Sequence, residues 1–340
     1  MKKLRILALM HDYLVPPNDT RMHNLQTVKW KTEHDVTSTL EEIGHSVELL
    51  GVKDELEDIR RAIGDYQPHI VFNLLEAFHE IGTFDQNLVS YLELLRVPYT
   101  GCNPRGLLLS RDKALAKKLL TYHHIPVPDF AVFRIDRKIK RPEQLSFPLI
   151  IKSLTQDASI GIAQSSVVND DARLSERITF IHKNIGTDAI VEQYIRGREL
   201  YVGVVGNERL QTFPIWEMYF TKMPKGSHRI ATDRTKWSTK YQKKYGIRTG
   251  QARNLSPVLA EHIQQIAKRV YRALELSGYA RIDFRLTVTD KIFVLEANPN
   301  PQIAFGEDFA ESAERGGLSY ENLLQQIINS GLRWQPERLG

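Results

Sequence analysis

The sequence predicts a mixed α/β fold, in which a parallel α/β layer is followed by α+β regions with antiparallel strands. Short apolar runs alternate with amphipathic helical stretches over the first hundred residues, an order typical of a parallel sheet. Near the carboxyl end, polar and apolar side chains alternate with a period of two in the runs 278–286 and 292–298. The short turn between these runs predicts that they pair as antiparallel strands.

The composition is that of an ordinary soluble globular protein with two or three domains. The chain has 340 residues, of which 42% are hydrophobic and 26% charged. The net charge is +5, and basic residues are interleaved with acidic ones, so binding to nucleic acid is not expected. A single cysteine, Cys102, forms no internal disulfide, and the chain begins with no apolar run long enough for a signal peptide or a membrane span. We therefore expect a cytoplasmic protein without a membrane segment.

The first 102 residues are expected to form the parallel layer. Its predicted strands are 6–10, 47–52, 70–75 and 98–101, with a helix over 84–95. No Gly-x-Gly-x-x-Gly follows the first strand, so this layer is expected to shape a substrate cleft rather than a dinucleotide site. Glu76 and His79 follow the third strand, at the edge where such sheets bind ligands, and either could meet a substrate ammonium. The alternative is that they are ordinary polar loop residues.

A second region begins near residue 103, with a predicted helix over 112–123 and a buried strand over 147–152 that ends in Lys152. The segment 155–161 that follows contains Ser159 and Gly161, and such small residues can point backbone amides at an anion. It could therefore cover a phosphate beside Lys152. A plain hairpin turn with a solvated lysine is equally compatible with the sequence.

The segment 190–205 reads as a strand, a glycine turn and a second strand, which is a natural hinge between domains. Glu192 and Glu199 flank this turn and could receive the amino group and the ribose hydroxyls of a nucleotide. Salt bridges to Arg196 or Arg198 explain either glutamate equally well.

The segment 216–253 is basic, includes Lys236 and is interrupted by one proline and three glycines. So long an irregular stretch predicts a lid or substrate loop. A solvated surface insertion and a contact with nucleic acid are the alternatives. Beyond it, apolar residues at helical spacing predict a core helix over 257–274 and a closing helix over 319–328.

The two alternating runs near the carboxyl end predict a magnesium site. A two-residue turn at Thr289 and Asp290 places Asp283 opposite Glu296, and Arg281 opposite Asn298, on one face. Facing carboxylates repel each other unless a cation lies between them, and oxygen donors of this kind suit magnesium. The alternative is a surface hairpin with ordinary charges.

Taken in order, the motifs Arg111–Ala114, Lys152, Glu192–Glu199, Arg281–Asp283 and Glu296–Asn298 resemble the ATP-grasp ligases, most closely the D-alanine:D-alanine ligase branch. The resemblance covers nearly the whole chain. It implies an ATP-grasp fold with an N-terminal pre-ATP-grasp α/β domain (1–102) and two α+β subdomains (103–191 and 192–340) that sandwich the nucleotide. It also implies an ADP-forming carboxylate–amine ligase that acts through an acylphosphate on amino-acid or peptide-like substrates, and a possible homodimer.

The resemblance assigns roles to individual residues. It implies two magnesium ions, replaceable by manganese, on Asp283, Glu296 and Asn298, with Arg281 at the oxyanion of the reaction. The expected ATP contacts are Lys113 and Lys152 at the phosphates, Glu192 and Ile195 at the adenine, Glu199 at the ribose, and Ser159 and Lys236 from the two covering segments.

Two segments depart from the family pattern and concern the substrates. His11–Leu14 replaces a glycine-rich segment whose glutamate binds the first substrate's ammonium, and Gln302–Glu307 replaces a glycine-serine run that binds the second substrate's carboxylate. Because Glu307 would repel a free carboxylate, we expect an acceptor other than D-alanine. Two alternative functions stay open: an ATP-binding regulator or idle paralogue that contacts a polyanion, and a carboxylating or carboxylate-phosphate-forming enzyme of the same fold.

Overall fold

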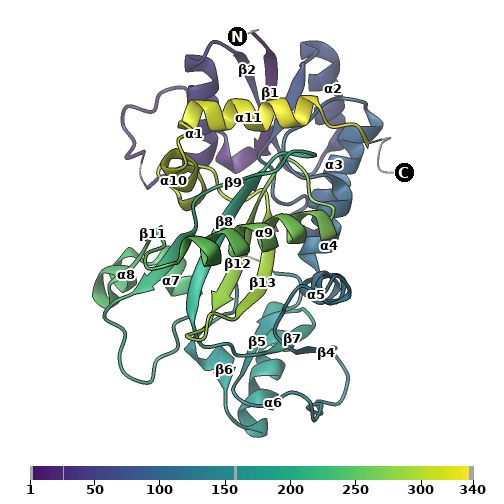
Figure 1. Ribbon diagram of the computed structural model, residues 1–340. Coiled ribbons are helices and arrows are strands. Elements are labelled where there is room, and N and C mark those ends of the chain that lie inside the picture. The colour runs from purple at the N-terminus through teal and green to yellow at the C-terminus, as the bar shows by residue number, and fades with distance from the viewer. Residues whose placement is uncertain (1–2, 26, 157–158, 337–340) are drawn as a thin grey trace.

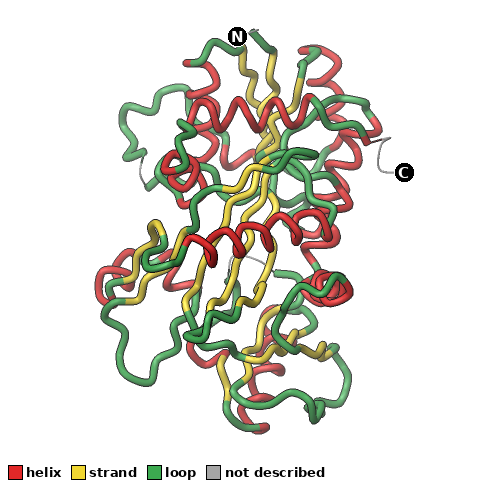
Figure 2. The backbone as a smooth tube through the Cα atoms, viewed as in Figure 1, coloured by secondary structure: helices red, strands yellow, loops and turns green. Residues whose placement is uncertain are grey.

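The computed structural model describes residues 3–25, 27–156 and 159–336 and contains three β-sheets. In Figure 1 the sheet of the first hundred residues lies at the top, the sheet formed by residues 198–299 in the middle, and the sheet formed by residues 130–193 at the bottom. The strands run through its middle, with helices flanking them (Figure 2). Within these described residues, no helix has the length and apolarity needed to cross a membrane.

The N-terminal sheet is parallel, as predicted. Its strand order is β2 (Ser46–Val52), β1 (Arg5–His11), β3 (Ile70–Asn73). The expected fourth strand, 98–101, is reduced to one parallel bridge between Tyr99 and Val71. The helices of this region are α1 (Lys31–Glu42), α2 (Leu56–Tyr66) and α3 (Asp85–Leu94), with short 3-10 turns at Asp12–Leu14 and Gly82–Phe84.

The last two helices of the chain return to this first sheet. They are α10 (Asp308–Arg315) and α11 (Tyr320–Leu332), and α11 lies across the sheet at the top of Figure 1. Leu323 and Ile327 of α11 share a buried core with Ile6 and Phe72. The amino and carboxyl ends of the chain are therefore held together by apolar burial, which is the main favourable term in folding.

The central sheet is antiparallel, with the order β4 (Phe130–Phe133), β7 (Ala189–Gln193), β5 (Leu149–Ser153), β6 (Val167–Val168). It follows helices α4 (Pro104–Arg111) and α5 (Lys113–Tyr122). Helix α6 (Asp171–Phe180) covers one face and continues into a π-helical turn, Ile181–Ile185; a 3-10 turn, Gln164–Ser166, precedes β6. The expected boundary after residue 191 falls inside β7, and the chain passes to the next sheet at 194–197.

The third sheet is the largest and carries the predicted metal-binding strands. Its order is β11 (Ile247–Gln251), β10 (Trp216–Phe220), β8 (Arg198–Val205), β12 (Tyr279–Leu286), β13 (Ile292–Pro299), with β9 (Gln211–Thr212) paired to β8. Helix α9 (Pro257–Ala273) covers one face, as expected, and buries Ile263 and Val270 against Leu200 and Ile282.

The prediction that 216–253 is one long loop was wrong. Strands β10 and β11 pair antiparallel at its two ends, and the short helices α7 (Asp233–Trp237) and α8 (Thr239–Tyr245) occupy much of the rest. The strands form because Trp216, Met218 and Ile247 bury one face in a common core. The sequence argument gave weight to the glycines and overlooked this alternation.

The β12–β13 hairpin has the predicted pairs but a different turn. Asp283 lies opposite Glu296 and Arg281 opposite Asn298, as expected. Closer to the turn, however, Leu286 pairs with Ile292, so the loop is centred on Thr289 and is not the expected two-residue turn. A bulge between Asp283 and Phe284 leaves Leu295 without a partner in the register. The turn and the bulge each shift the pairing by one residue, and the two shifts cancel at Asp283.

Candidate active site

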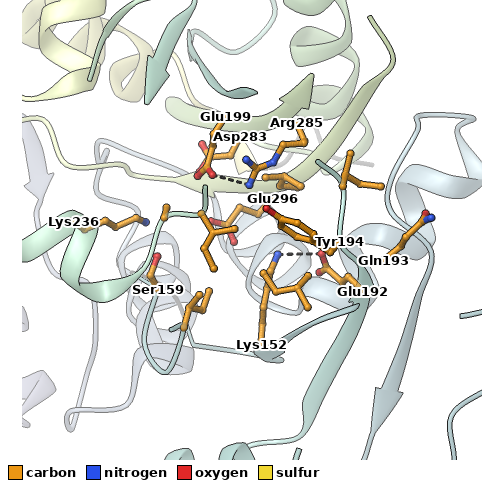
Figure 3. Close-up of a pocket in the computed structure, with 16 residues that line it drawn as sticks. Lys152, Ser159, Glu192, Gln193, Tyr194, Glu199, Lys236, Asp283, Arg285 and Glu296 are labelled. Carbon is orange, nitrogen blue, oxygen red and sulfur yellow. Dashed lines mark hydrogen bonds and ion pairs between the residues drawn. The ribbon is translucent and has the colours of Figure 1, made fainter. Parts of the chain in front are cut away.

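A cleft of about 590 Å³ lies between the central sheet and the large sheet. Eight of the predicted site residues line it, and Figure 3 shows how they converge from β5, β7, β8, β12, β13 and the segments between them. They are Lys152, Ser159, Glu192, Ile195, Glu199, Lys236, Asp283 and Glu296. Residues more than 140 positions apart in the chain thus meet at one site.

Glu192 is held by two lysines in the floor of the cleft. Its Oε2 accepts a hydrogen bond of 3.0 Å from Lys152, and Lys117 Nζ lies 3.4 Å from Oε1, although that contact does not meet hydrogen-bond geometry. Burial alone would raise the pKa of Glu192, but the two lysines outweigh burial and lower it. The carboxylate is therefore ionised, and Oε1 accepts no hydrogen bond from the part of the chain that the structure describes.

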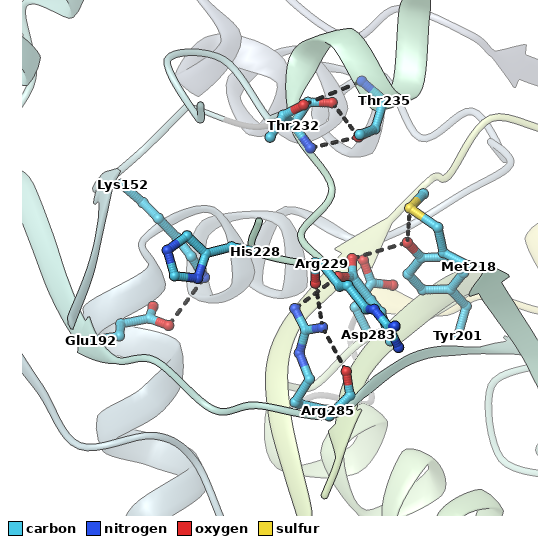
Figure 4. A network of polar contacts seen from close by, with 12 residues as sticks. Lys152, Glu192, Tyr201, Met218, His228, Arg229, Thr232, Thr235, Asp283 and Arg285 are labelled. Carbon is cyan, nitrogen blue, oxygen red and sulfur yellow. Dashed lines mark hydrogen bonds and ion pairs between the residues drawn. The ribbon is translucent and has the colours of Figure 1, made fainter. Parts of the chain in front are cut away.

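Glu199 is oriented from both sides. Arg285 donates to its Oε2 at 2.8 Å, and the Tyr201 hydroxyl donates to its Oε1 at 3.0 Å. Arg285 also donates to the carbonyl of Arg229 at 2.9 Å, as Figure 4 shows. The alternative of salt bridges to Arg196 or Arg198 is wrong for both glutamates, because buried lysines and Arg285 are the partners and Arg198 pairs with Glu217.

Asp283 and Glu296 face each other across β12 and β13, and their pKa values are shifted in opposite directions. Burial raises the pKa of Asp283, and Arg281, which donates to both its oxygens at 2.7 and 2.9 Å, only partly offsets this effect. Burial would also raise the pKa of Glu296, but Lys113, Lys152 and Lys236 outweigh it and lower the pKa. Glu296 is therefore an ionised carboxylate within a positive environment.

The hairpin fits magnesium only together with phosphate oxygens. The described residues contain no group of three or more His, Cys, Asp or Glu side chains that could hold a metal ion. Two carboxylates are present, and Asn298 adds a carboxamide whose Nδ2 is buried without a partner in the described structure. Magnesium is usually held by one or two carboxylates plus substrate phosphates, so this donor set is compatible with it. The carboxylate of Asp283 would then bind the ion while it accepts hydrogen bonds from Arg281.

The covering segments supply further positive charge. Lys113, in the first turn of α5, donates to the carbonyl of Gln156 at 2.8 Å, so it contacts the expected phosphate cover; residues 157 and 158 of that cover lie outside the described residues. Ser159 and Gly161 have left-handed backbones, with φ of 63° and 73°. The register of β5 with β6 excludes a plain hairpin turn here, since Leu149 pairs with Val168. Lys236 extends into the cleft from α7 (Figure 3).

Comparison with known proteins places this geometry in a family. Residues 119–329 match the family model described as D-ala D-ala ligase C-terminus. A D-alanine–D-alanine ligase of Desulfotalea psychrophila is 30% identical over 305 residues, which cover 86% of this chain and 87% of that protein. The chain belongs to the D-alanine–D-alanine ligase family. It is therefore an ATP-grasp enzyme of the ADP-forming carboxylate–amine ligase type.

This ligase is also similar to a second curated protein and to a solved structure. The protein y4sG of Sinorhizobium fredii is 29% identical over 299 residues, covering 86% of this chain and 85% of that protein. The crystal structure of a D-alanine–D-alanine ligase from Bacillus anthracis, complexed with ATP, superposes with a TM-score of 0.74 at 21% identity, covering 97% of this chain and 98% of that one. This second likeness confirms the predicted fold.

The predicted substrate residues of this ligase lie outside the cleft described above. Glu76 and His79 are exposed beyond the end of β3, and His79 and Glu80 form the tip of a tight turn closed by Phe78 and Ile81. Glu307 directly precedes α10, and burial and the neighbouring Asp308 raise its pKa. All three stay candidates for substrate contacts.

Sequence reasoning missed three charged residues of this ligase. Lys117 lies one helical turn after Lys113, and Arg285 lies on the same strand face as Asp283. Spacing therefore places both beside predicted site residues, but it does not show which carboxylates they meet. Glu33 lies in the first turn of α1, where an acidic residue gives no signal of a site. In the structure it is only 5% exposed, and its Oε2 has no partner among the described residues. Burial, with a contribution from Glu76, raises its pKa to about 7.

Proposed function

We propose that this ligase joins an amino-acid-like acid to an amine other than D-alanine, using ATP and magnesium and releasing ADP and phosphate. The observation that carries the proposal is the ionised Glu296 opposite Asp283, in a cleft surrounded by lysines. Such a site holds a triphosphate and a divalent ion together. Arrays of positive charge and metal ions provide most of the catalysis in phosphoryl transfer.

The nucleotide would lie with its adenine against Ile195 and its amino group on Glu192 Oε1. That oxygen is suited to the role because it is buried, ionised and without a hydrogen bond in the described structure. Glu199, fixed by Arg285 and Tyr201, would accept the ribose hydroxyls. The phosphates would then extend toward Lys113 of α5, Lys152 of β5 and Lys236 of the covering segment 216–253.

The reaction would have two steps. A substrate carboxylate oxygen attacks the γ-phosphorus of ATP, the bond to ADP breaks, and an acylphosphate forms. The amine nitrogen then attacks the acyl carbon, phosphate leaves with its bonding electrons, and the nitrogen loses a proton to water. Arg281 Nη1, which takes no part in the pair with Asp283, would stabilise the oxyanion. Magnesium, or manganese in its place, would be held by Asp283, Glu296 and Asn298 and would offset the repulsion between carboxylate and triphosphate.

The acid substrate would carry a cationic group. The carboxyl end of the N-terminal sheet is acidic. The charges of Glu33 and Glu76 both help to raise the pKa of the Tyr13 hydroxyl, and the charge of Glu76 also raises the pKa of Glu33. An ammonium placed there would provide a partner for Glu33 Oε2, which has none among the described residues. The acceptor would carry no free carboxylate near Glu307, where it would meet the charges of Asp308 and Glu311 as well.

The proposal is tested by incubating the protein with ATP, magnesium and pooled amino acids and short peptides, and searching by mass spectrometry for a condensed product that lacks one water. ADP release that requires both an acid and an amine supports the ligase. ATP binding with no product, accompanied by salt-sensitive binding to nucleic acid, would favour the regulator instead. ADP release stimulated by bicarbonate would favour the carboxylating enzyme. The position of Lys236 inside the cleft supports a nucleotide rather than a polyanion as its partner.

A further inference from the structure

Lys117 connects three parts of the active-site cleft. It lies on α5 and is only 2% exposed. Its Nζ donates a 2.9 Å hydrogen bond to the carbonyl of Leu295 on β13, and it lies 3.4 Å from Glu192 on β7. One ammonium group thus bridges the central sheet and the strand of the predicted metal site.

The carbonyl that Lys117 binds belongs to the bulge. Leu295 is the residue left without a partner where the β12–β13 register shifts, and it directly precedes Glu296. Without the bulge, the register set at Leu286 and Ile292 would place Leu295 opposite Asp283. The bulge shifts the register by one residue and so brings Glu296 opposite Asp283. A one-residue slip in a strand sends every side chain to the other face of the sheet. Fixing the Leu295 carbonyl therefore fixes the direction of the Glu296 carboxylate.

Stability alone does not account for a buried lysine here. Lys117 and Lys152 both lie beside the carboxylate of Glu192, and the nearby charge of Glu296 is shared with Lys113 and Lys236. Positive charge is therefore in excess around them. Burial lowers the pKa of Lys117, and the charge of Lys152 lowers it further, against the attraction of Glu192. Burying such ions costs free energy, and proteins that carry apolar residues of similar volume in their place are often as stable or more stable. The lysine is better explained by the groups that it orients.

We propose that Lys117 is a positioning residue that holds the Leu295 bulge, and with it Glu296, in the geometry needed for magnesium, while it keeps Glu192 Oε1 directed at the nucleotide. The proposal rests on the proposed function for the identity of the metal and the nucleotide. Lys117 itself contacts neither of them. It acts through a backbone carbonyl on one side and a carboxylate on the other.

The test measures binding, so it does not require known substrates. Titration calorimetry with a non-hydrolysable ATP analogue, over a series of magnesium concentrations, is performed on the wild type and on Lys117→Met. The variant keeps the length of the side chain but loses the donor and the charge. Loss of residues that orient metal ligands commonly costs 10- to 100-fold in metal affinity. We therefore expect about 10- to 100-fold more magnesium to be needed for half-maximal enhancement of analogue binding.

Two further variants separate positioning from general disruption. Lys118→Met changes the neighbouring exposed lysine and should leave the magnesium requirement unchanged. Lys117→Arg keeps a cationic donor. The magnesium concentration that it needs for half-maximal enhancement should therefore lie close to the wild-type value. If Lys117→Met does not fold, Lys117→Gln takes its place with the same expectation, a magnesium requirement raised at least tenfold.

A magnesium requirement within twofold of the wild type, in a folded Lys117→Met or Lys117→Gln protein, would overturn the positioning role. That outcome differs from failure of the ligase proposal. In the latter case the wild type would bind the analogue and magnesium normally but form no condensed product with any acid and amine.

Discussion

Glu33→Gln should stabilise the protein above pH 7 and have little effect at pH 4. Glu33 is buried, and its pKa is raised from 4.5 to about 7. Because the folded state holds the proton more tightly than the unfolded chain, the stability that this group contributes is complete below pH 4.5 and is lost as the pH rises through 7. The cost of ionising it in the folded state reaches about 3 kcal/mol above pH 7. Glutamine resembles the protonated acid at every pH and avoids this cost.

The assay is urea unfolding followed by circular dichroism, at pH 4 and at pH 8, for the wild type and Glu33→Gln. The difference in unfolding free energy between the two proteins should grow from near zero at pH 4 to about 3 kcal/mol in favour of the variant at pH 8. Glu41→Gln, on the exposed side of the same helix, is the matched control and should show no such growth.

A difference that is equal at both pH values, or a variant that is less stable at pH 8, would refute the reasoning that burial raises the pKa of Glu33. The same substitution tests the proposed cationic substrate. If Glu33 receives an ammonium, the variant should gain stability and lose affinity for the acid, with KM raised on the order of tenfold or more and kcat less affected.

Three other substitutions test the cleft. Glu296→Gln should abolish ADP release while the protein still melts cooperatively, because it removes the ionised carboxylate that faces Asp283; normal turnover would remove the metal assignment. Lys152→Met should sharply raise the KM for ATP, since it deletes a charge at the phosphates, and unchanged kinetics would contradict that role. Gln164→Ala should loosen the covering segments, because Gln164 exchanges hydrogen bonds of 2.9 and 2.8 Å with the backbone of His228. We expect faster cleavage near residue 228 in limited proteolysis, which ATP should slow; equal cleavage rates would show that these bonds do not hold the segment.

The sequence predicted the order of the sheets because apolar periodicity follows directly from burial. Strand β1 and helix α9 show this best. The continuous apolar run 6–10 is buried throughout in β1, and the buried residues of α9 recur at the expected helical spacing. The same reasoning failed for 216–253, where the buried face of β10 spans only five residues and two helices interrupt the pattern. An alternation of apolar and polar residues this short predicts a strand less strongly than the neighbouring glycines predict a loop.

The parts of the site that lie within one hairpin could be predicted from the sequence. The contacts between charged residues that are distant in the chain could not. The register of Asp283 with Glu296 came from one hairpin, although the assumed turn was wrong and the bulge compensated for it. The partners of Glu192 and Glu199 could not be foreseen in the same way. Lys117 and Arg285 lie 75 and 86 residues away along the chain, so only the packing of α5 and β12 against these strands shows the pairs.

The charges of the cleft are arranged for an anion rather than for stability. Among the residues that the structure describes, six cationic side chains lie in or beside the cleft. The carboxylates there are Glu192, Glu199, Asp283 and Glu296, and Asp308 also acts on Arg281. The cations are Lys113, Lys117, Lys152, Lys236, Arg281 and Arg285. Buried ion pairs add little net stability, and an excess of buried positive charge costs free energy. A bound triphosphate would remove that excess, and the ion held between Asp283 and Glu296 would in turn relieve the repulsion between those carboxylates. The folded protein therefore carries an electrostatic cost that the proposed ligands would offset, as expected where polar groups are preorganised for catalysis.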